Sequence, residues 1–273
     1  MRQAIKPQHI NDFAHYLKLA EKSKDTIDKY THDIRKFAEH LNGGYISKDA
    51  VIAYKAQLLS NGRAVTGINA VIAAINSFLG FLELSDMKVK PFKVQRKQFR
   101  DSNREMTQND YTNLLSAALN SGNRQLWLIM QTICSTGIRV SELQFVTVEA
   151  VRLGQITVTN KGKTRVVPLT DKLCAKLTTY IMKSKIVSGA VFCISRNALW
   201  REMKKLCAKA GVESGKVFPH NLRHLFAVTF YSRERDIVKL ASILGHSDIN
   251  TTRIYTLESD KTYRVGLDLG LVA

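Results

Sequence analysis

Four short segments in the second half of the chain carry side chains suited to binding a phosphate. The first covers residues 136–143, where Gly137 predicts the end of one helix and Arg139 lies near the start of the next. A guanidinium beside a helix start offers several hydrogen-bond donors to an anion. Glu142, one turn later, can orient Arg139. Because Arg–Glu pairs are common on protein surfaces, this segment alone decides nothing.

The second segment is Lys-Gly-Lys-Thr-Arg at residues 161–165, between β-branched runs at 155–160 and 164–169. Two such runs around a glycine-containing turn predict a β-hairpin. A lysine at the tip can meet a phosphate or a leaving oxygen, although turns favour such residues for their conformation alone. Lys161 and Lys163 are both candidates for that role, and Lys161 is preferred.

The third segment, residues 219–226, opens with Pro219, which suits the first turn of a helix. His220 and Arg223 are three residues apart, so they share one face and can bind one phosphate together. The predicted buried stripe of this helix consists of Leu222, Leu225, Phe226 and Thr229. A zinc pair of His220 with His224 is the competing interpretation. We reject it because Asn221 replaces the glutamate of a zinc protease and Arg223 would repel the metal.

The fourth segment covers residues 244–255, in which Gly245 predicts a helix end before His246, and Tyr255 closes the run. Tyrosine is a poor nucleophile at its ordinary pKa of about 10. It becomes useful where cations stabilise both the phenolate and a phosphorane-like transition state. A single tyrosine is usually structural, but an ordered set of Arg, Lys, His-x-x-Arg, His and Tyr can perform phosphoryl transfer without a metal.

The elements that must position these residues fall into two domains. The first 86 residues show helical periodicity with no strand pattern, which predicts a bundle of four short helices. On the second of these helices, the polar group Thr31, His32, Arg35 and Lys36 either faces DNA or is simply solvated. Residues 104–273 predict a helix-rich domain with one small antiparallel sheet, beginning with a helix capped by Thr107 and Asp110. The fold class is therefore mainly α, with a minor β component.

Residues 87–103 between the two domains predict an extended basic linker. Six basic residues and no acidic residue lie between positions 88 and 100, and Pro91 disfavours a helix. Such a segment can follow a phosphate backbone, or it can be an exposed linker without a partner. The candidate DNA contacts are Lys88, Lys90, Lys93, Arg96, Lys97 and Arg100.

The composition agrees with a polyanionic partner. The 273 residues include 41 Lys and Arg against 23 Asp and Glu, a formal charge of +18, and nucleic acid is the commonest polyanion. A basic protein without such a partner is the alternative. The longest apolar stretch, residues 71–84, is shorter than the roughly 20 residues of a membrane span. The cysteines show no metal-site spacing, so we expect buried free thiols in a reducing cytoplasm at Cys134, Cys174, Cys193 and Cys207.

Four stretches, TGIRVSEL, NKGKTRVVPL, PHNLRHLFA and LGHSDINTTRIYT, resemble the signature segments of the tyrosine recombinase (phage integrase) family. SKDTIDKYTHDIRKFAEHL also resembles the SAM-like core-binding domain of that family, so the resemblance covers most of the chain. The length is similar to the two-domain, Xer-type branch. The hairpin turn looks one residue shorter than in that branch, which leaves the reach of Lys161 open.

The resemblance implies a site-specific recombinase that forms a 3′-phosphotyrosyl intermediate. Arg139 and Arg223 would bind the scissile phosphate, Tyr255 would attack it, and Lys161 would protonate the departing 5′-oxygen. His220 would assist proton transfer at the Tyr255 hydroxyl, and His246 would bind the phosphate. Glu142 would support Arg139. No metal, ATP or other cofactor is expected, because the covalent link keeps the energy of the phosphodiester bond.

The family also implies double-stranded DNA with specific sites as partner, a homotetramer on that DNA, and a cytoplasmic, nucleoid-associated enzyme. The tail at residues 263–273 would dock on a neighbouring subunit or on its own domain, through Val265, Leu267, Leu269 and Leu271. Integration or excision of a mobile element is the first biological role to consider. Xer-like dimer resolution, DNA inversion, a type IB topoisomerase and a non-catalytic DNA-binding regulator are the alternatives.

Overall fold

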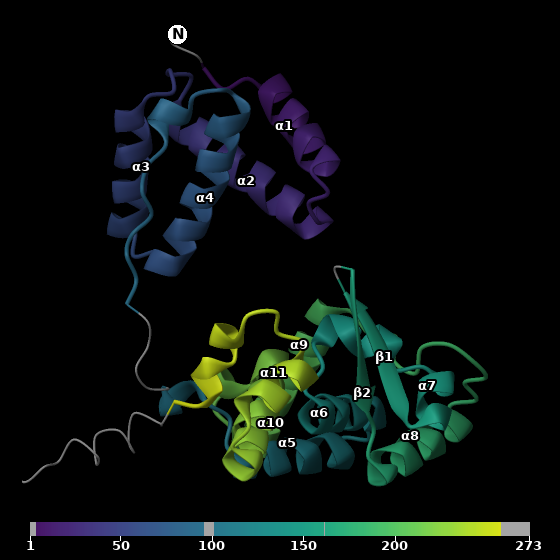
Figure 1. Cartoon of the computed structure of the whole chain (residues 1–273). Coiled ribbons are helices and arrows are strands. Elements are labelled where there is room, and N and C mark those ends of the chain that lie inside the picture. Colours follow the sequence, from purple (N-terminus) through teal and green to yellow (C-terminus); the bar gives the residue numbers. More distant parts are fainter. Residues whose placement is uncertain (1–3, 96–100, 161, 258–273) are drawn as a thin grey trace, which may run out of the picture. The chain divides into compact units, whose positions relative to one another are not determined.

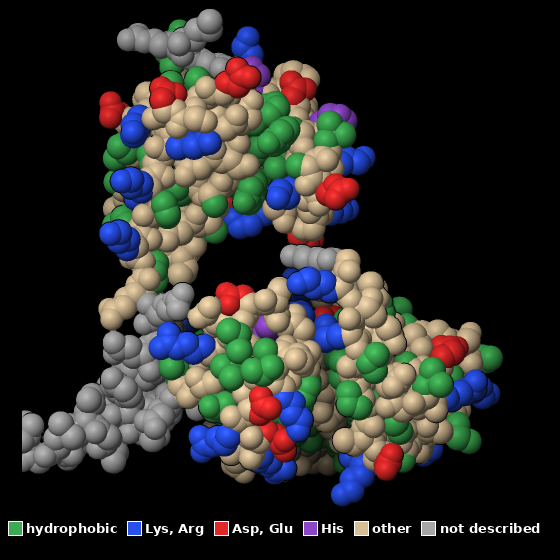
Figure 2. All heavy atoms as spheres, viewed as in Figure 1, with side chains coloured by type: hydrophobic (Ala, Val, Ile, Leu, Met, Phe, Trp, Pro, Cys, Tyr) green, Lys and Arg blue, Asp and Glu red, His purple; other side chains and the backbone are tan. Residues whose placement is uncertain are grey.

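The computed structural model describes residues 4–95, 101–160 and 162–257 (Figure 1). The chain divides into two compact units, residues 1–96 and residues 97–273, each with its own hydrophobic core. Lys and Arg side chains are spread over the visible face of both units (Figure 2). No helix among the described residues is long and apolar enough to cross a bilayer.

The first unit contains the four predicted helices, α1 (Pro7–Leu19), α2 (Lys24–Leu41), α3 (Lys48–Ser60) and α4 (Val65–Phe81). Serine side chains cap α2 and α3, since Ser23 and Ser47 accept hydrogen bonds from the first-turn amides. The core is formed by side chains at helical spacing, among them Phe13, Ile34, Phe37, Val51, Ile68 and Phe78. Thr31 is an exception to its predicted polar face, because it is buried and its hydroxyl donates to the Ile27 carbonyl at 2.9 Å.

Part of the predicted basic linker is fixed to the first unit. After the short 3₁₀ helix η1 (Ser85–Met87), Val89 is buried in the first core and Phe92 packs against it. Two asparagines two turns apart on α4 hold this stretch. Asn76 exchanges hydrogen bonds with the backbone N–H and C=O of Val89 at 3.1 and 2.8 Å, and Asn69 does the same with Phe92 at 2.8 and 2.9 Å. Two side-chain amides thus take the place of a neighbouring β-strand.

Of the six basic residues predicted to contact DNA from the linker, the structure describes three. Lys88, Lys90 and Lys93 are exposed. The others, Arg96, Lys97 and Arg100, lie outside the described residues.

Among its described residues, the regular secondary structure of the second unit is helical apart from one antiparallel hairpin, which confirms the predicted fold class. Its α-helices are α5 (Gln108–Asn120), α6 (Arg124–Thr136), α7 (Val148–Leu153), α8 (Asp171–Lys183), α9 (Arg196–Ala210), α10 (Pro219–Glu234) and α11 (Ile237–Leu244). The 3₁₀ helices are η2 (Ser102–Arg104), η3 (Val140–Phe145), η4 (Ser214–Lys216), η5 (Ile249–Thr251) and η6 (Arg253–Tyr255). The predicted capping box of α5 is present, because Thr107 and Asp110 each bind the other's backbone N–H.

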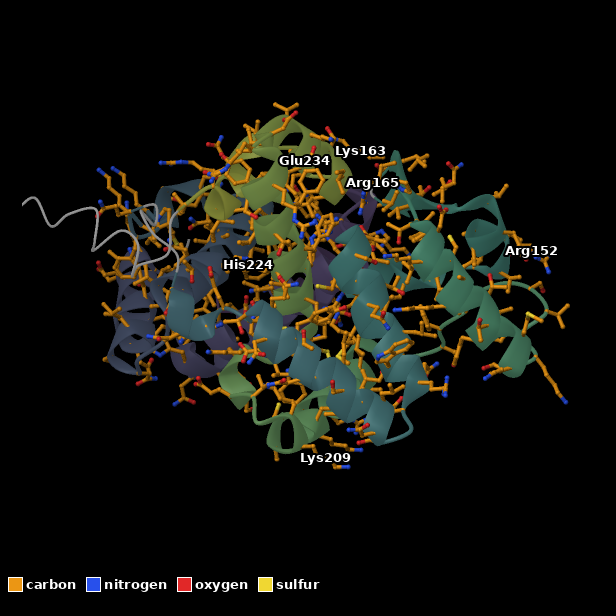
Figure 3. All side chains as sticks on the ribbon, turned by 90° about the horizontal axis from the view of Figure 1, so that it is seen from below. Arg152, Lys163, Arg165, Lys209, His224 and Glu234 are labelled. Atoms are coloured by element: carbon orange, nitrogen blue, oxygen red, sulfur yellow. The ribbon has the colours of Figure 1, made fainter. Side chains whose placement is uncertain are left out.

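The hairpin pairs β1 (Gln155–Asn160) with β2 (Lys163–Pro168), and β1 also contacts α7 while β2 contacts α11. Side chains alternate between the two faces of a strand. Val167 is buried, and Arg165, two residues earlier on the same face, has a side chain only 15% exposed. Lys163 continues that face toward the turn (Figure 3).

Gly137 ends α6 in the left-handed conformation, with φ at +68°. A β-carbon built there would lie 2.5 Å from the Phe226 ring on α10. The Gly137 carbonyl also accepts a hydrogen bond from Arg223 at 2.6 Å. Glycine is therefore required by the backbone conformation and by the close approach of α10.

We expect Gly137→Ala to lower the free energy of unfolding by about 2–4 kcal/mol, the sum of a left-handed alanine and an overpacked ring. Gly211→Ala is the matched control, because Gly211 ends α9 at φ +63° with no atom within 4 Å of the added carbon. That control should cost about 1 kcal/mol. Urea denaturation of both variants measures the difference between their losses of unfolding free energy. Equal losses would show that the Phe226 ring moves aside without an energetic cost.

Two smaller predictions about buried residues need correction. Cys193 is exposed and lies outside any helix or strand, while Cys207 is buried and Cys134 and Cys174 are partly buried. All four thiols are free. On α10, Leu222 is buried as expected, but the remaining members of the predicted stripe, Leu225, Phe226 and Thr229, are only partly buried.

Candidate functional site

A buried carboxylate, Glu142, organises the cationic cluster of the second unit. Its side chain is 1% exposed and accepts two hydrogen bonds from the Arg165 guanidinium, at 3.1 and 2.7 Å. It also accepts one bond from the Arg139 guanidinium at 3.0 Å and one from the Arg139 backbone N–H at 2.7 Å. Arg223 Nη1 lies 4.0 Å from the same carboxylate. One anion therefore holds three guanidinium groups in place.

The ionisation of Glu142 is secured by these partners. Burial alone raises the pKa of a carboxyl group, but hydrogen bonds from Arg165 and Arg139 outweigh it and lower the pKa of Glu142 below its ordinary value. Three guanidinium groups around one carboxylate leave excess positive charge, so the cluster can bind an additional anion.

Among the described residues, Arg223 is the largest of the fully buried side chains, at 2% exposure. The sequence analysis left Arg223 out of the predicted buried stripe of α10, but the structure places its side chain fully inside. Its guanidinium donates to the carbonyl of Gly137 at 2.6 Å and to the carbonyl of Leu244 at 2.8 Å, so both helix ends supply acceptors. Burial, and then the nearby Arg139 charge, lower the pKa of Arg223 to about 10, which leaves it charged at neutral pH.

His246 follows the C-cap glycine of α11 and is held from both ring nitrogens. Its Nε2 lies 3.0 Å from Arg223 Nη2, and its Nδ1 lies 2.9 Å from the hydroxyl of buried Thr252. Because a guanidinium can only donate, Nε2 must accept, and the ring proton sits on Nδ1 and is donated to Thr252. Burial and the charges of Arg223, Arg139 and Arg165 lower the pKa of His246 to about 4.

This shift predicts a pH dependence of stability. The folded pKa of His246, about 4, lies below its ordinary value of 6.5, so the unfolded chain binds more protons between these two values. The contribution of His246 is complete above pH 6.5 and is lost as the pH falls toward 4. We expect the stability advantage of the wild type over His246→Gln, measured by urea denaturation, to shrink across that window. An advantage that stays constant would mean that His246 is not held neutral.

Tyr255 lies in η6, is 5% exposed, and its ring lies near two imidazole rings. The His246 ring is nearly parallel to it, with centroids 6.4 Å apart, and the His224 ring is tilted, with centroids 5.2 Å apart. Burial raises the pKa of the Tyr255 phenol, while the charge of Arg223 and a hydrogen bond from it act in the opposite direction. The phenol oxygen therefore lies beside the buried guanidinium of the same chain.

Two cavities meet at Arg139, whose side chain is 35% exposed. One, of about 740 Å³, is also lined by His220, Arg223 and Trp200. The other, of about 510 Å³, is lined by Lys163, Arg165 and His246 among others. Burial of the His220 side chain, and then the charge of Arg223, lower the pKa of His220, which favours a neutral ring. A group bound at Arg139 is thus reached from His220 on one side and from Lys163 on the other.

Five predicted catalytic positions, together with Glu142, form this one cluster although they span more than 110 residues of sequence. The five are Arg139, His220, Arg223, His246 and Tyr255. The sixth, Lys161, lies outside the described residues. His224, the alternative zinc partner of His220, bonds instead to Glu105 at 3.0 Å.

Sequence reasoning missed the roles of Arg165 and Thr252 in holding the cluster, although both residues lie within the recognised segments at 161–165 and 244–255. Arg165 binds Glu142 and also donates to the Ile243 carbonyl at 3.1 Å. The alternation of β2 gives a signal for it, since Arg165 shares a face with buried Val167. Thr252 carries no comparable signal in the sequence.

Family models match both units of the chain. The model described as "Phage integrase family" matches residues 104–262, more than half of the chain. The model described as "Phage integrase, N-terminal SAM-like domain" matches residues 10–85.

Known proteins with similar sequences include tyrosine recombinase XerA of Pyrococcus horikoshii, 30% identical over 95% of this chain and 92% of that protein. Tyrosine recombinase XerD of Staphylococcus aureus is 30% identical over 89% of this chain and 90% of its own length.

Solved structures share the fold. XerH bound to its difH substrate is 17% identical, with a TM-score of 0.70 over 97% of this chain and 85% of that one. A lambda integrase tetramer bound to a Holliday junction is 16% identical, with a TM-score of 0.70 over 94% of this chain and 80% of that one.

Proposed function

The chain belongs to the phage integrase family of tyrosine recombinases, enzymes that cleave and rejoin DNA, and we propose that it is a site-specific recombinase whose nucleophile is Tyr255. The observation that carries this proposal is the position of the Tyr255 phenol beside the buried Arg223 guanidinium of its own chain. A cation next to the phenol stabilises the phenolate as it forms, and the same cation binds the phosphate under attack.

The proposed cleavage step is a transesterification. Arg139 and Arg223 bind the non-bridging oxygens of the scissile phosphate. His246 donates a hydrogen bond to the same group from Nε2, once its ring proton has moved from Nδ1 to that nitrogen. The Tyr255 oxygen attacks phosphorus, and its proton passes to His220. The bond between phosphorus and the 5′-oxygen breaks, and a lysine of the hairpin gives that oxygen a proton. The products are a 3′-phosphotyrosyl link and a free 5′-hydroxyl, and attack by a 5′-hydroxyl of another strand reverses the step.

For three of these residues, one observation each supports the assigned role. Neutral His220 can accept a proton, since its pKa is lowered. Arg139 is partly exposed and lies between the two cavities, so a phosphate can approach it. Arg223 is fixed by two carbonyls, which lets it meet the transition state without reorganising. This chemistry uses neither a metal nor ATP, because one phosphodiester bond is exchanged for another.

The general acid is assigned to Lys161, with Lys163 as the rival because it lines the cavity beside Arg139. A substrate with sulfur in place of the scissile 5′-oxygen distinguishes them, because a thiolate leaves without needing a proton. We expect Lys161→Ala to lose cleavage about 100-fold or more on the ordinary substrate. Cleavage of the sulfur substrate by that variant should be nearly normal. The same rescue seen for Lys163→Ala instead would move the role to Lys163.

DNA is the proposed partner for both units, with the first unit as a core-binding domain. The exposed side chains of Lys88, Lys90 and Lys93 support phosphate contacts from the connecting segment. A tetramer on two duplexes is proposed because strand exchange between two sites needs four cuts. The fold shared with a lambda integrase tetramer supports that assembly.

For the biological role we propose integration or excision of a mobile element, with Xer-like dimer resolution and DNA inversion as the alternatives. DNA trapped on Tyr255 from cells and sequenced at the covalent junction would identify the site. Plasmids carrying two such sites then separate the roles. Fusion of separate plasmids indicates integration, whereas products formed only between sites on one molecule indicate resolution or inversion. Relaxation of a plasmid that carries a single site would indicate a topoisomerase instead.

A further inference from the structure

The side of α10 that does not line the two cavities binds the segment through which the chain enters the second unit. Asn221, 5% exposed, donates from its amide nitrogen to the Arg104 carbonyl at 2.8 Å and to the Lys216 carbonyl at 2.7 Å. One turn later, His224 Nε2 lies 3.0 Å from the Glu105 carboxylate. The next residue, Met106, is buried in the core of the unit. Residues 104–106 are therefore fixed directly to the helix that carries His220 and Arg223.

His224 has a second contact, with the ring of Tyr255. The two centroids are 5.2 Å apart and the rings are tilted by 54°, while the His246 ring lies nearly parallel to Tyr255 at 6.4 Å. Each of these imidazoles is held by other groups. His246 is held by Arg223 and Thr252, and His224 is held by Glu105. The lateral position of the Tyr255 ring thus depends on a carboxylate at the entry to the second unit.

We propose that His224 is a positioning residue for Tyr255, and that Glu105 couples the orientation of the nucleophile to the end of the segment that joins the two units. The inference rests on the proposed function, in which Tyr255 attacks phosphorus. A phenol swings about two side-chain torsions, so its oxygen reaches the phosphorus only when the ring is held laterally. A displacement of about 1 Å costs up to about 100-fold in rate. A shift of residues 104–106 would act on the rate of cleavage through His224, with little effect on DNA affinity.

The test is single-turnover formation of the covalent adduct on a nicked duplex that traps the cleaved strand. Glu105→Ala should slow adduct formation about 10- to 100-fold. Its DNA dissociation constant should stay within about twofold, because a carboxylate offers no favourable contact to the phosphate backbone. Glu105→Gln should recover most of the rate, because the amide oxygen still accepts a hydrogen bond from His224. Glu213→Ala, which removes an exposed carboxylate from the same unit, is the matched control and should cleave normally.

A double-mutant cycle separates coupling from a general structural effect. In a His224→Ala background, Glu105→Ala should cause no further loss of cleavage rate, because the imidazole that connects Glu105 to Tyr255 is already absent. Independent, multiplying losses would overturn the inference, as would a normal rate for Glu105→Ala. If His224→Ala does not fold, the comparison of Glu105→Ala with Glu105→Gln still decides. Tyr255→Phe distinguishes the failures: if it abolishes the adduct while Glu105→Ala cleaves normally, the proposed function stands and this coupling falls.

Discussion

Tyr255→Phe should bind its DNA normally and form no covalent adduct. The substitution removes only the nucleophilic oxygen, so the rate of adduct formation should fall by about 10⁵-fold or more, as for other essential nucleophiles. The ring should keep its contacts with His224 and His246, because those contacts involve the rings rather than the hydroxyl. Denaturing electrophoresis of protein mixed with a nicked duplex measures the adduct, and a gel-shift titration measures binding.

Tyr180→Phe is the matched control, since Tyr180 also lies in the second unit, packs against Phe192 and lines neither cavity at Arg139. It should form the adduct at the wild-type rate. An adduct that persists in Tyr255→Phe would place the nucleophile elsewhere in the chain. Loss of DNA binding together with cleavage would indicate instead that Tyr255 serves the fold.

Arg139→Ala should reduce the cleavage rate by about 10³-fold, as expected when one preorganised donor to a transition-state oxygen is lost. Affinity for DNA should fall only severalfold, because the chain carries many other cations that can contact a phosphate backbone. The variant should remain folded, because Arg139 is 35% exposed and Glu142 keeps its two hydrogen bonds from Arg165. Comparing the single-turnover rate with the dissociation constant separates these effects.

Two further variants sharpen the result for Arg139. Arg139→Lys keeps the charge but loses the fork of parallel donors, so it should recover only part of the rate. Arg152→Ala removes the same charge from an exposed position on α7 that lines neither cavity, and it should cleave normally. Equal cleavage by Arg152→Ala and Arg139→Ala would remove Arg139 from the site.

Both predictions depend on an unusual electrostatic arrangement. The cluster places Arg139, Arg165 and Arg223 around the single buried carboxylate of Glu142. The excess positive charge is tolerated in part because the backbone carbonyls of Gly137, Ile243 and Leu244 accept further donors of Arg165 and Arg223. Burial, and then this charge, lower the pKa of His246, and the same charge opposes the effect of burial on the pKa of Tyr255. A bound phosphate would balance this excess positive charge. A transition state that carries more negative charge than the bound phosphate would be stabilised further.

The sequence alone determined those parts of the protein that depend on neighbours along the chain. Helix periodicity predicted α1 to α4, Thr107 and Asp110 predicted the start of α5, and Gly137 predicted the end of α6. These patterns are local, because helix capping and side-chain periodicity involve residues one to four positions apart. The ordered segments around Arg139, His220 and Tyr255 likewise predicted which side chains would gather.

Tertiary structure alone decided how those side chains are held. Arg223 is buried because carbonyls 86 and 21 positions away accept its donors, and no local pattern encodes such partners. Arg165 enters the site through Glu142, 23 positions earlier, and His224 meets Glu105 across 119 positions. Likewise, Asn69 and Asn76 fix part of a segment whose composition predicts a free linker. A hydrogen bond has the same energy whatever the separation of its partners in sequence, so the folded chain, and not the pattern, selects them.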